Sequence, residues 1–211
     1  MGELHVDLFT TLDGVVQAPG GPEEDPEGEF EFGGWQAPLL DEEVGRLVGE
    51  GIDRLDALLL GRRTYDIFAG YWPNATVDEP IATKFNAIPK YVASRTNPTL
   101  EWAGSELLGP DLAAEVHRIT ALHDEVHVIG SANLVQSLLR EDLVDRLNLW
   151  VYPITLGTGK KLFDGGAIPA VFRLDGPAIT GSSGAVALRY ARAEGRPRPS
   201  TGDMGAPDRG I

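Results

Sequence analysis

The chain has 211 residues, no cysteine, and 32 acidic against 18 basic side chains, which gives a formal net charge of −14 at pH 7. The lack of cysteine excludes disulfides, thiolate catalysis and cysteine-ligated metal centres, and the negative charge disfavours nucleic acid and anionic membranes as partners. No apolar run is long enough to span a membrane and the first residues do not form a signal-sequence pattern, so we expect a cytoplasmic protein.

The first third of the chain contains two predicted strands separated by a long loop and a helix. Residues 3–11 alternate apolar and polar side chains before a turn signal, which predicts a strand. Residues 17–34 are rich in glycine, proline and acids, so we expect a long loop that cannot form a core. Apolar side chains at helical spacing follow Asp41, and residues 57–60 predict a buried strand with a short helix from about Thr64.

Strand and helix patterns then alternate through the rest of the chain. We predict helices over residues 81–87, 111–122 and 131–141, and strands over residues 90–94, 125–130 and 145–154. This alternation favours an α/β fold of three layers, α/β/α, with a mostly parallel twisted sheet.

The end of the chain differs from this alternating pattern. Residues 171–179 and 185–193 are expected to add a C-terminal antiparallel hairpin to the sheet. The last residues lack apolar periodicity. We therefore expect one domain over residues 1–194 and a disordered tail over residues 195–211.

Glycine and free amides follow the predicted strand at 125–130. In an open α/β sheet, ligands bind at the carboxyl ends of strands because helix N-termini direct N–H groups there. A pyrophosphate could be held at this point by the backbone of Gly130, Ser131, Ala132, Asn133 and Leu134. Taken alone, a glycine turn with Ser131 as the helix cap is slightly favoured over this interpretation, and the G-x-G-x-x-G spacing is absent.

Cationic side chains follow two other predicted strands. The strand at 57–60 is followed by Gly61, Arg62, Arg63 and Thr64, and the strand at 90–94 ends in Ser94 and Arg95. Guanidinium forks and hydroxyls fit a phosphate monoester such as the 2′-phosphate that distinguishes NADPH from NADH. The alternative is that an arginine pairs with Asp66 or another nearby acid. Because the two clusters occur at adjacent strand ends, we favour the phosphate interpretation.

Four segments in this order carry a family resemblance: LLLGRRTYD, KYVASRT, EVHVIGSANLVQSLL and RLNLWVYPITLGTGKKLF. They resemble the dihydrofolate-reductase-like superfamily, and most closely the C-terminal reductase domain of the bacterial riboflavin-biosynthesis deaminase/reductase. The resemblance covers roughly residues 3–194 and implies a dihydrofolate-reductase-like fold with NADPH across the strand ends. Dihydrofolate reductases usually have two glycines joined by a cis peptide where this chain has Gly130–Ser131, and the sequence leaves the cis bond open.

The implied cofactor contacts agree with the residue chemistry. The resemblance implies that the adenosine phosphate is held by Gly61, Arg62 and Thr64, with Ser94 and Arg95 flanking it, and that residues 130–134 cover the pyrophosphate. It also implies hydride transfer to a C=N bond, with a proton from a carboxyl group or an ordered water. Glu43 could correspond to the folate enzymes' helix carboxylate, with Asp41 as the competitor, although capping and dipole compensation is the favoured role for both.

Aromatic side chains are the predicted substrate contacts. Trp35, with Phe30 and Phe32 in the long loop, could close over a flat heterocycle, and Trp150 could line the same site; the alternative is that the tryptophans fill the core. The four histidines lack metal-ligand spacing, so no metal is predicted.

The expected function is that of an NADPH-dependent reductase of a small heterocyclic or imine substrate. The closest named activity is 5-amino-6-(5-phosphoribosylamino)uracil reductase, and family analogy implies a homodimer. A dihydrofolate or pterin reductase, a flavin-binding reductase and a non-catalytic NADPH-binding module are the alternatives.

Overall fold

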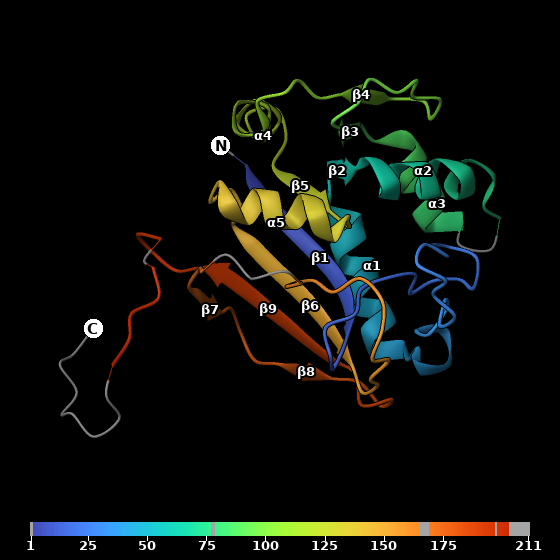
Figure 1. Ribbon diagram of the computed structural model, residues 1–211, viewed down its shortest axis with the longest axis vertical. Coiled ribbons are helices and arrows are strands. Elements are labelled where there is room, and N and C mark those ends of the chain that lie inside the picture. The colour runs from blue at the N-terminus through green and yellow to red at the C-terminus, as the bar shows by residue number, and fades with distance from the viewer. Residues whose placement is uncertain (1, 77–78, 165–168, 197, 203–211) are drawn as a thin grey trace.

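The computed structural model describes residues 2–76, 79–164, 169–196 and 198–202, which form one nine-stranded sheet with helices on both faces. Figure 1 shows the helices and strands along the chain. The strands are β1 (Glu3–Thr11), β2 (Ala57–Gly61), β3 (Lys90–Ala93), β4 (Ser105–Leu107), β5 (Glu125–Val128), β6 (Arg146–Tyr152), β7 (Phe172–Leu174), β8 (Ile179–Thr180) and β9 (Val186–Arg192). The helices are α1 (Glu42–Arg54), α2 (Arg62–Tyr71), α3 (Glu79–Ala87), α4 (Leu112–Thr120) and α5 (Ala132–Arg140), with 3-10 turns at Ala37–Leu39 and Trp72–Asn74.

The sheet has a parallel part and an antiparallel part. Its order is β4-β3-β2-β5-β1-β6-β9-β7, with β8 paired to β9. All neighbours from β4 to β6 run parallel, whereas β9 is antiparallel to β6, β7 and β8. The predicted mostly parallel sheet with antiparallel C-terminal strands is therefore confirmed, with two short strands rather than one long arm facing β9.

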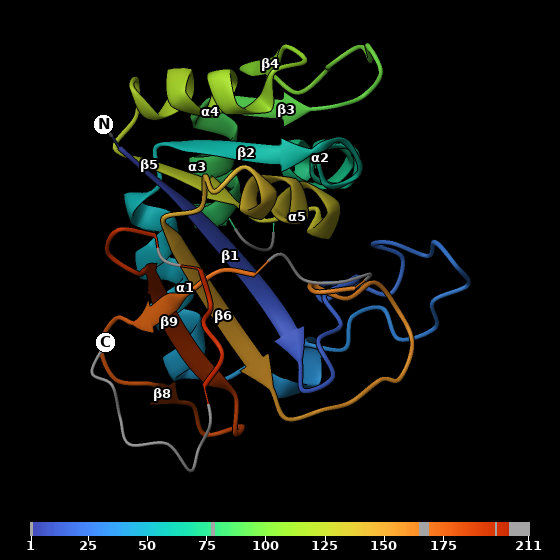
Figure 2. The same ribbon diagram turned by 60° about the vertical axis from the view of Figure 1, so that its left-hand side comes forward.

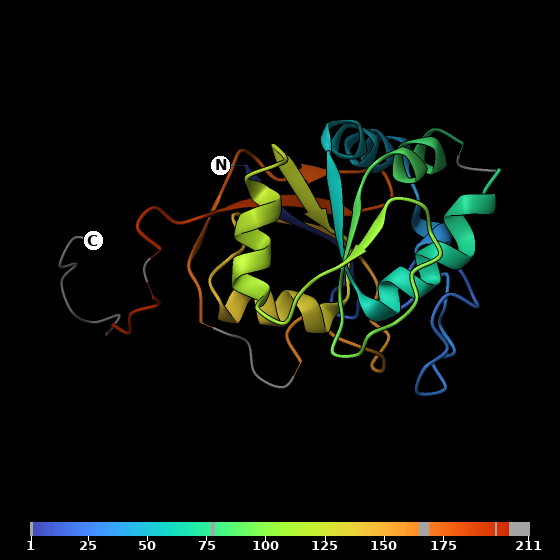
Figure 3. The same cartoon turned by 90° about the horizontal axis from the view of Figure 1, so that it is seen from above.

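Helices cover both faces of the sheet, as Figure 3 shows from above, with α4 and α5 on one side and α1 and α3 on the other. Side chains of a strand alternate between the faces. On β1, Leu4 and Val6 point towards α4 and α5, where they join Leu138 in the largest apolar cluster. His5 and Asp7 consequently point to the opposite face.

The α1 face contains two smaller apolar clusters. One places Val44 and Leu47 of α1 against Trp150 of β6. The other places Leu60 of β2 against Phe85 of α3. Helix α1 begins after Asp41, whose carboxylate accepts a hydrogen bond from the Val44 N–H at 2.9 Å, which is the capping arrangement that the acids of this segment predicted.

The element boundaries differ from the sequence prediction by a few residues, and one strand was not predicted. Strand β4 has only the sequence Ser-Glu-Leu, which carries no alternation to recognise. Of the predicted tail, residues 197 and 203–211 lie outside the described residues. Across the described ranges, none of the helices has both the length and the apolar character needed to cross a lipid bilayer.

Candidate functional site

Two strand-to-helix junctions meet at the carboxyl end of the parallel strands. Strands β2 and β5 are neighbours, and each leads directly into a helix, α2 and α5 respectively; Figure 2 shows β2 running into α2 close to α5. The Gly61 N–H donates a hydrogen bond to the Gly130 carbonyl at 3.1 Å. The two glycine turns that the sequence assigned to one cofactor site are therefore direct neighbours in the structure.

Both positions in this junction require glycine. A Cβ atom at Gly61 would lie 2.4 Å from Ser131 Oγ and 3.0 Å from Ser131 N. A Cβ atom at Gly130, whose φ is +136°, would lie 2.8 Å from Thr64 Oγ1. The peptide bond between Gly130 and Ser131, which the sequence left open, is cis. The two junctions therefore pack backbone against side chain with no room for another methyl group.

The first turns of α2 and α5 have no side-chain cap. Gly61 and Ser131 occupy the N-cap positions, and neither makes a side-chain capping hydrogen bond. The N–H groups of a first turn need an acceptor from outside the helix. The interpretation of Ser131 as a simple capping residue is thus not what the structure shows, and both helix starts offer free donors and positive dipole ends to an anion.

The two arginines of α2 pair with acids in the described structure. Arg62 Nε lies 2.7 and 2.8 Å from the carboxylate oxygens of Asp66, and Arg63 Nη2 lies 3.1 Å from Asp25 Oδ1. The acid-pairing alternative from the sequence therefore describes both residues as they stand. Their side chains are 38% and 51% exposed, and solvent-exposed pairs of this kind contribute about 0–1 kcal/mol, so a phosphate can displace the acids.

Strand β3 places two further predicted residues beside the junction, because Ala93 is the neighbour of Gly61 in the sheet. Ser94 Oγ accepts a hydrogen bond from the Thr96 N–H at 3.1 Å. Arg95 is exposed and makes no hydrogen bond or ion pair with any residue that the structure describes. Its guanidinium is therefore available to a ligand without displacing a partner.

The long loop is fastened by charges to the first turn of α2 and to the loop after β6. Lys160 Nζ lies 2.6 Å from Asp25 Oδ2 and 2.6 Å from Glu27 Oε2, and Asp25 also contacts Arg63 of α2. Gln17 accepts a hydrogen bond from the Lys160 N–H at 2.9 Å. Figure 2 shows the two loops, which follow β1 and β6, lying side by side.

The same loop contributes to the core, which corrects the sequence expectation. Ala18 and Phe30 are 3% and 7% exposed, and Phe30 packs so closely on Gly159 that a Cβ there would lie 2.7 Å from the ring. Trp35 is also buried, and its Nε1–H donates to the Gln17 carbonyl at 2.8 Å. Composition alone misled because a few apolar residues suffice to anchor a loop rich in glycine and acids.

The two predicted catalytic carboxylates have structural partners. Asp41 caps α1 and also accepts a hydrogen bond from Ser183 Oγ at 2.6 Å, and the Ser183 bond contributes most to lowering its pKa. Glu43 is half-buried and pairs with Arg46 at 2.7 Å, which lowers its pKa as well. Ser183, the partner of Asp41, lies between β8 and β9. In the strand order β8 and β9 are separated from β2 and β5 by β1 and β6, so Asp41 lies away from the Gly61–Gly130 junction.

The two predicted substrate tryptophans both lie in the apolar cluster beneath α1. Trp150 is 7% exposed, and its ring centroid lies 5.4 Å from that of Phe9. Its indole nitrogen is buried without a hydrogen-bond partner among the described residues. The ring centroids of Trp35 and Tyr152 lie 5.6 Å apart in an edge-to-face arrangement. The core-filling alternative fits both residues as placed, and Phe32, which is 43% exposed, is the loop aromatic that faces solvent.

Gln17, Asp25 and Lys160 form the part of the site that the sequence did not assign together. Lys160 follows a glycine-rich segment after the strand predicted at 145–154, and Gln17 and Asp25 lie in the segment expected to be a long loop. Because 135 residues separate Asp25 from Lys160, no local pattern connects them. The one available signal was the excess of acids in this loop.

Comparison with known proteins gives a family match over most of the chain. The family model described as the RibD C-terminal domain matches residues 3–183. The uncharacterised protein YyaP of Bacillus subtilis (strain 168) is 24% identical over 164 residues, which make up 76% of this chain and 79% of YyaP.

Solved structures give the same fold. A protein from Shewanella sp. PV-4, assigned provisionally to riboflavin biosynthesis, has a TM-score of 0.70 at 20% identity, covering 91% of this chain and 99% of that protein. Dihydrofolate reductase from Enterococcus faecalis, complexed with NADP(H) and RAB-propyl, has a TM-score of 0.53 at 14% identity, covering 92% and 98% of the two chains. At these identities the likeness shows the fold, which is dihydrofolate-reductase-like.

Proposed function

The chain belongs to the RibD C-terminal domain family of RibD-like reductases, and from this premise we propose that it is an NADPH-dependent reductase of a small heterocyclic or imine-bearing substrate. The observation that carries the proposal is the junction of β2–α2 with β5–α5. There, two uncapped helix starts meet across a pair of glycines that leave no space for side chains. Such an arrangement suits a diphosphate held by backbone amides.

The donors around the junction fit a nucleotide with an additional phosphate. The first-turn amides of α5 would bind the pyrophosphate, and Gly130 lets the backbone approach it closely. Arg62, Ser94 and Arg95 would bind the 2′-phosphate, with Arg62 exchanging its pair with Asp66 for the more highly charged group. When bound, NADPH supplies the hydride for reduction of the substrate C=N bond.

The proton that completes the reduction comes, in this proposal, from water. A general acid works best when its pKa lies near the operating pH. The contacts of Asp41 and Glu43 lower the pKa of both carboxyls, so both stay ionised at neutral pH and are poor proton donors. The chain's own contribution is then to orient the two reactants and to limit access through the loop fastened by Lys160 and Asp25.

The substrate is proposed to be a flat, nitrogen-rich ring or an open ribosylimine, as in 5-amino-6-(5-phosphoribosylamino)uracil reductase. The exposed ring of Phe32 lies on the long loop, with its centroid 5.9 Å from that of Phe30, so it can meet a heterocycle without leaving its support. A pterin or dihydrofolate would satisfy the same contact.

NADPH consumption tests the activity directly. The full chain is incubated with NADPH and, in turn, with a ribosylimine of a diaminouracil, dihydrofolate and dihydropterins, and the loss of reduced cofactor is followed by absorbance. We expect oxidation with at least one substrate. NADPH binding without turnover on any of them would favour a non-catalytic module, and a yellow protein as purified would point to a flavin enzyme.

We also propose that the chain forms a homodimer through the edge of its sheet at β7. This strand ends the sheet order, and its Leu174 is 44% exposed. An unpaired edge with an exposed apolar side chain is suited to pairing with a second copy. Size-exclusion chromatography with light scattering measures the molar mass of the protein in solution. A monomer at micromolar concentration would rule the dimer out.

A further inference from the structure

A row of acids and histidines lies on the α1 face of the sheet, away from the Gly61–Gly130 junction. On β1 these residues are Glu3, His5 and Asp7, and on β5 they are Glu125 and His127. The parallel register pairs Glu3 with Glu125 and His5 with His127, so the two rows lie side by side. Alternation along each strand then puts all five side chains on one face.

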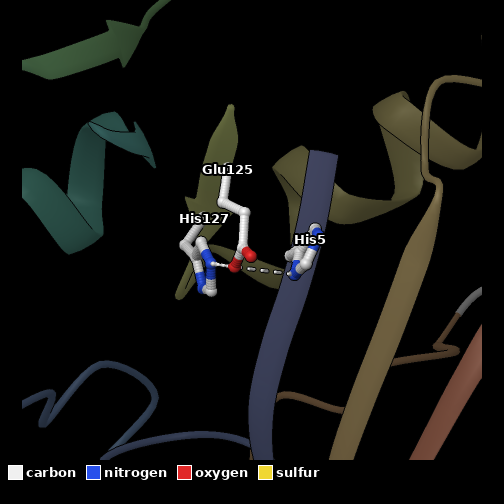
Figure 4. Close-up of side chains that lie close together, drawn as sticks. All are labelled: His5, Glu125 and His127. Atoms are coloured by element: carbon white, nitrogen blue, oxygen red, sulfur yellow. Dashed lines mark hydrogen bonds and ion pairs between the residues drawn. The ribbon is translucent and has the colours of Figure 1, made fainter. Parts of the chain in front are cut away.

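Three of these side chains converge on one point, as Figure 4 shows. His127 Nε2 lies 3.3 Å and His5 Nδ1 lies 3.8 Å from the same oxygen, Oε2 of Glu125. All three atoms lie within 4.8 Å of one another. Ligand bonds of about 2.0–2.1 Å in a tetrahedral zinc site correspond to ligand separations of about 3.3 Å, so the cluster needs only small side-chain rotations to reach that geometry.

The outer nitrogen of each imidazole is already held by a carboxylate. His127 Nδ1 lies 2.7 Å from Asp7 Oδ2, and His5 Nε2 lies 3.2 Å from Glu3 Oε2. Asp7 is fixed in turn by the Asn148 side-chain amide at 2.9 Å. Metal-binding histidines characteristically donate their second ring N–H to a carboxylate in this way, which directs the other nitrogen to the ion.

We propose that His5, Glu125 and His127 form a binding site for a divalent transition-metal ion, with Zn²⁺ as the best fit. Two imidazole nitrogens and one carboxylate oxygen are ligands that Zn²⁺ accepts, with a water in the fourth position. The same donors disfavour Mg²⁺ and Ca²⁺, which prefer oxygen. The bound ion would join β1 to β5 at the centre of the sheet.

Burial and charge are consistent with this assignment. The side chains of His5 and His127 are 11% and 4% exposed, whereas Glu125 is 26% exposed and leaves a path for an ion to enter. Arg54 of α1 lies 3.6 Å from Oε1 of Glu125, the oxygen that the site does not use. The nearby carboxylates of Glu3 and Asp7 offset the positive charge that a divalent ion brings.

This site differs from the sequence prediction, which gave no metal. The ligands come from alternate positions of two strands that are neighbours only in the folded sheet, with 120 residues between His127 and Asp7. No contiguous motif marks such a site. The inference is also independent of the proposed reductase activity, because the cluster shares no residue with the proposed cofactor site at the Gly61–Gly130 junction.

Zinc titration of the tag-free full chain tests the proposal. We expect one Zn²⁺ per chain, measured by calorimetry at neutral pH, and affinity lower by about tenfold or more in His5→Gln and Glu125→Gln. His117→Gln is the matched control, since His117 is an exposed histidine of α4 outside the cluster, and it should bind zinc as the parent does. Equal affinity in all four proteins, or no zinc binding by the parent at micromolar concentration, would overturn the proposal.

A measurement on the unaltered chain covers the case in which a variant fails to fold. Zinc added to the ¹⁵N-labelled parent should shift the imidazole signals of His5 and His127 and leave those of His117 and His123 in place. Shifts confined to His117 or His123 would contradict the assignment. NADPH affinity is also measured with and without zinc, which separates the metal site from the proposed cofactor site. We expect the Gly61–Gly130 junction to bind NADPH in both states.

Discussion

The Gly61–Gly130 junction and the His5–Glu125–His127 cluster share strand β5 but are built in opposite ways. The junction offers two helix starts that have no side-chain cap among the described residues, and its glycines leave the backbone open to a ligand. The cluster offers side chains whose outer atoms are all bonded and whose inner atoms converge. The junction thus depends on the backbone and on the absence of bulky side chains, whereas the cluster depends on side chains that converge.

The difference shows which kinds of site a sequence discloses. A glycine after a buried strand and before a helix is a local feature, so Gly61 and Gly130 are visible in the linear chain. A cross-strand cluster depends on register, and a slip of one residue would turn every histidine to the other face. Backbone sites are thus predictable where side-chain clusters between distant strands are not.

The contrast between the two sites would fail most directly if NADPH binding tolerated a methyl group at Gly61. In Gly61→Ala the added Cβ would lie 3.0 Å from the Ser131 backbone nitrogen, so the start of α5 must shift. Losing one charge-assisted hydrogen bond to the pyrophosphate costs about 1.5–3 kcal/mol, so we expect NADPH affinity to fall by about one to two orders of magnitude. Calorimetric titration measures it.

Gly70→Ala provides the matched control for this prediction. Gly70 lies in the same helix, α2, and a Cβ there has nothing within 4 Å. Alanine is the better helix former by about 1 kcal/mol, so this variant should be slightly more stable and bind NADPH as the parent does. Equal NADPH affinity of the two variants would show that the junction does not hold the cofactor.

The variant Arg62→Gln tests the role of side chains next to the Gly61–Gly130 junction. Removing the guanidinium should weaken NADPH binding by about tenfold and leave NADH binding unchanged, because only the 2′-phosphate is affected. The control is Arg46→Gln, which removes an arginine that is likewise paired with acids of its own helix, Glu43 and Glu50 on α1. If both coenzymes lose affinity equally, Arg62 acts through the helix rather than through the phosphate.

The ion pairs of Asp25 with Lys160 and Arg63 should have a smaller effect, on the stability of the fold, and this effect depends on pH. Burial raises the pKa of Asp25, but the hydrogen bond and charge of Lys160 more than offset it, so the pKa of the folded state lies below the ordinary value. A carboxyl with a depressed pKa stabilises the fold above the unfolded pKa of about 3.9, and this contribution is lost as the pH falls through the folded value.

Asp25→Asn should therefore lower the free energy of unfolding by about 1–2 kcal/mol at neutral pH, with the difference vanishing in acid. Urea unfolding at several pH values measures it, with Glu31→Gln as a control on an exposed acid of the same loop. A pH-independent difference would mean that the ion pairs with Lys160 and Arg63 contribute nothing.

The smallest effect is expected at Glu43. Its carboxylate is exposed and paired with Arg46, and such pairs contribute about 0–1 kcal/mol. We expect Glu43→Gln to keep turnover within about twofold of the parent, whereas loss of a general acid costs about a hundredfold or more. A large drop in kcat without a change in NADPH affinity would instead assign the proton to Glu43.

The sequence predicted the fold and the strand-end positions well because those signals are local. Periodicity located the buried strand Ala57–Gly61 and the helix after Gly130, and their order implied a parallel sheet. It could not predict β4, whose three residues carry no pattern. It also could not connect Asp25 with Lys160 or Asp41 with Ser183, since these pairs join segments 135 and 142 residues apart.

Parallel titration of the unaltered chain with NADPH and NADH tests the central claim most directly. Amides at two helix starts should give binding to both coenzymes, and the arginines at the neighbouring strand ends should give NADPH an advantage of about tenfold or more. Equal affinities, or no binding of either coenzyme, would contradict the account of the Gly61–Gly130 junction as a site for a phosphorylated dinucleotide.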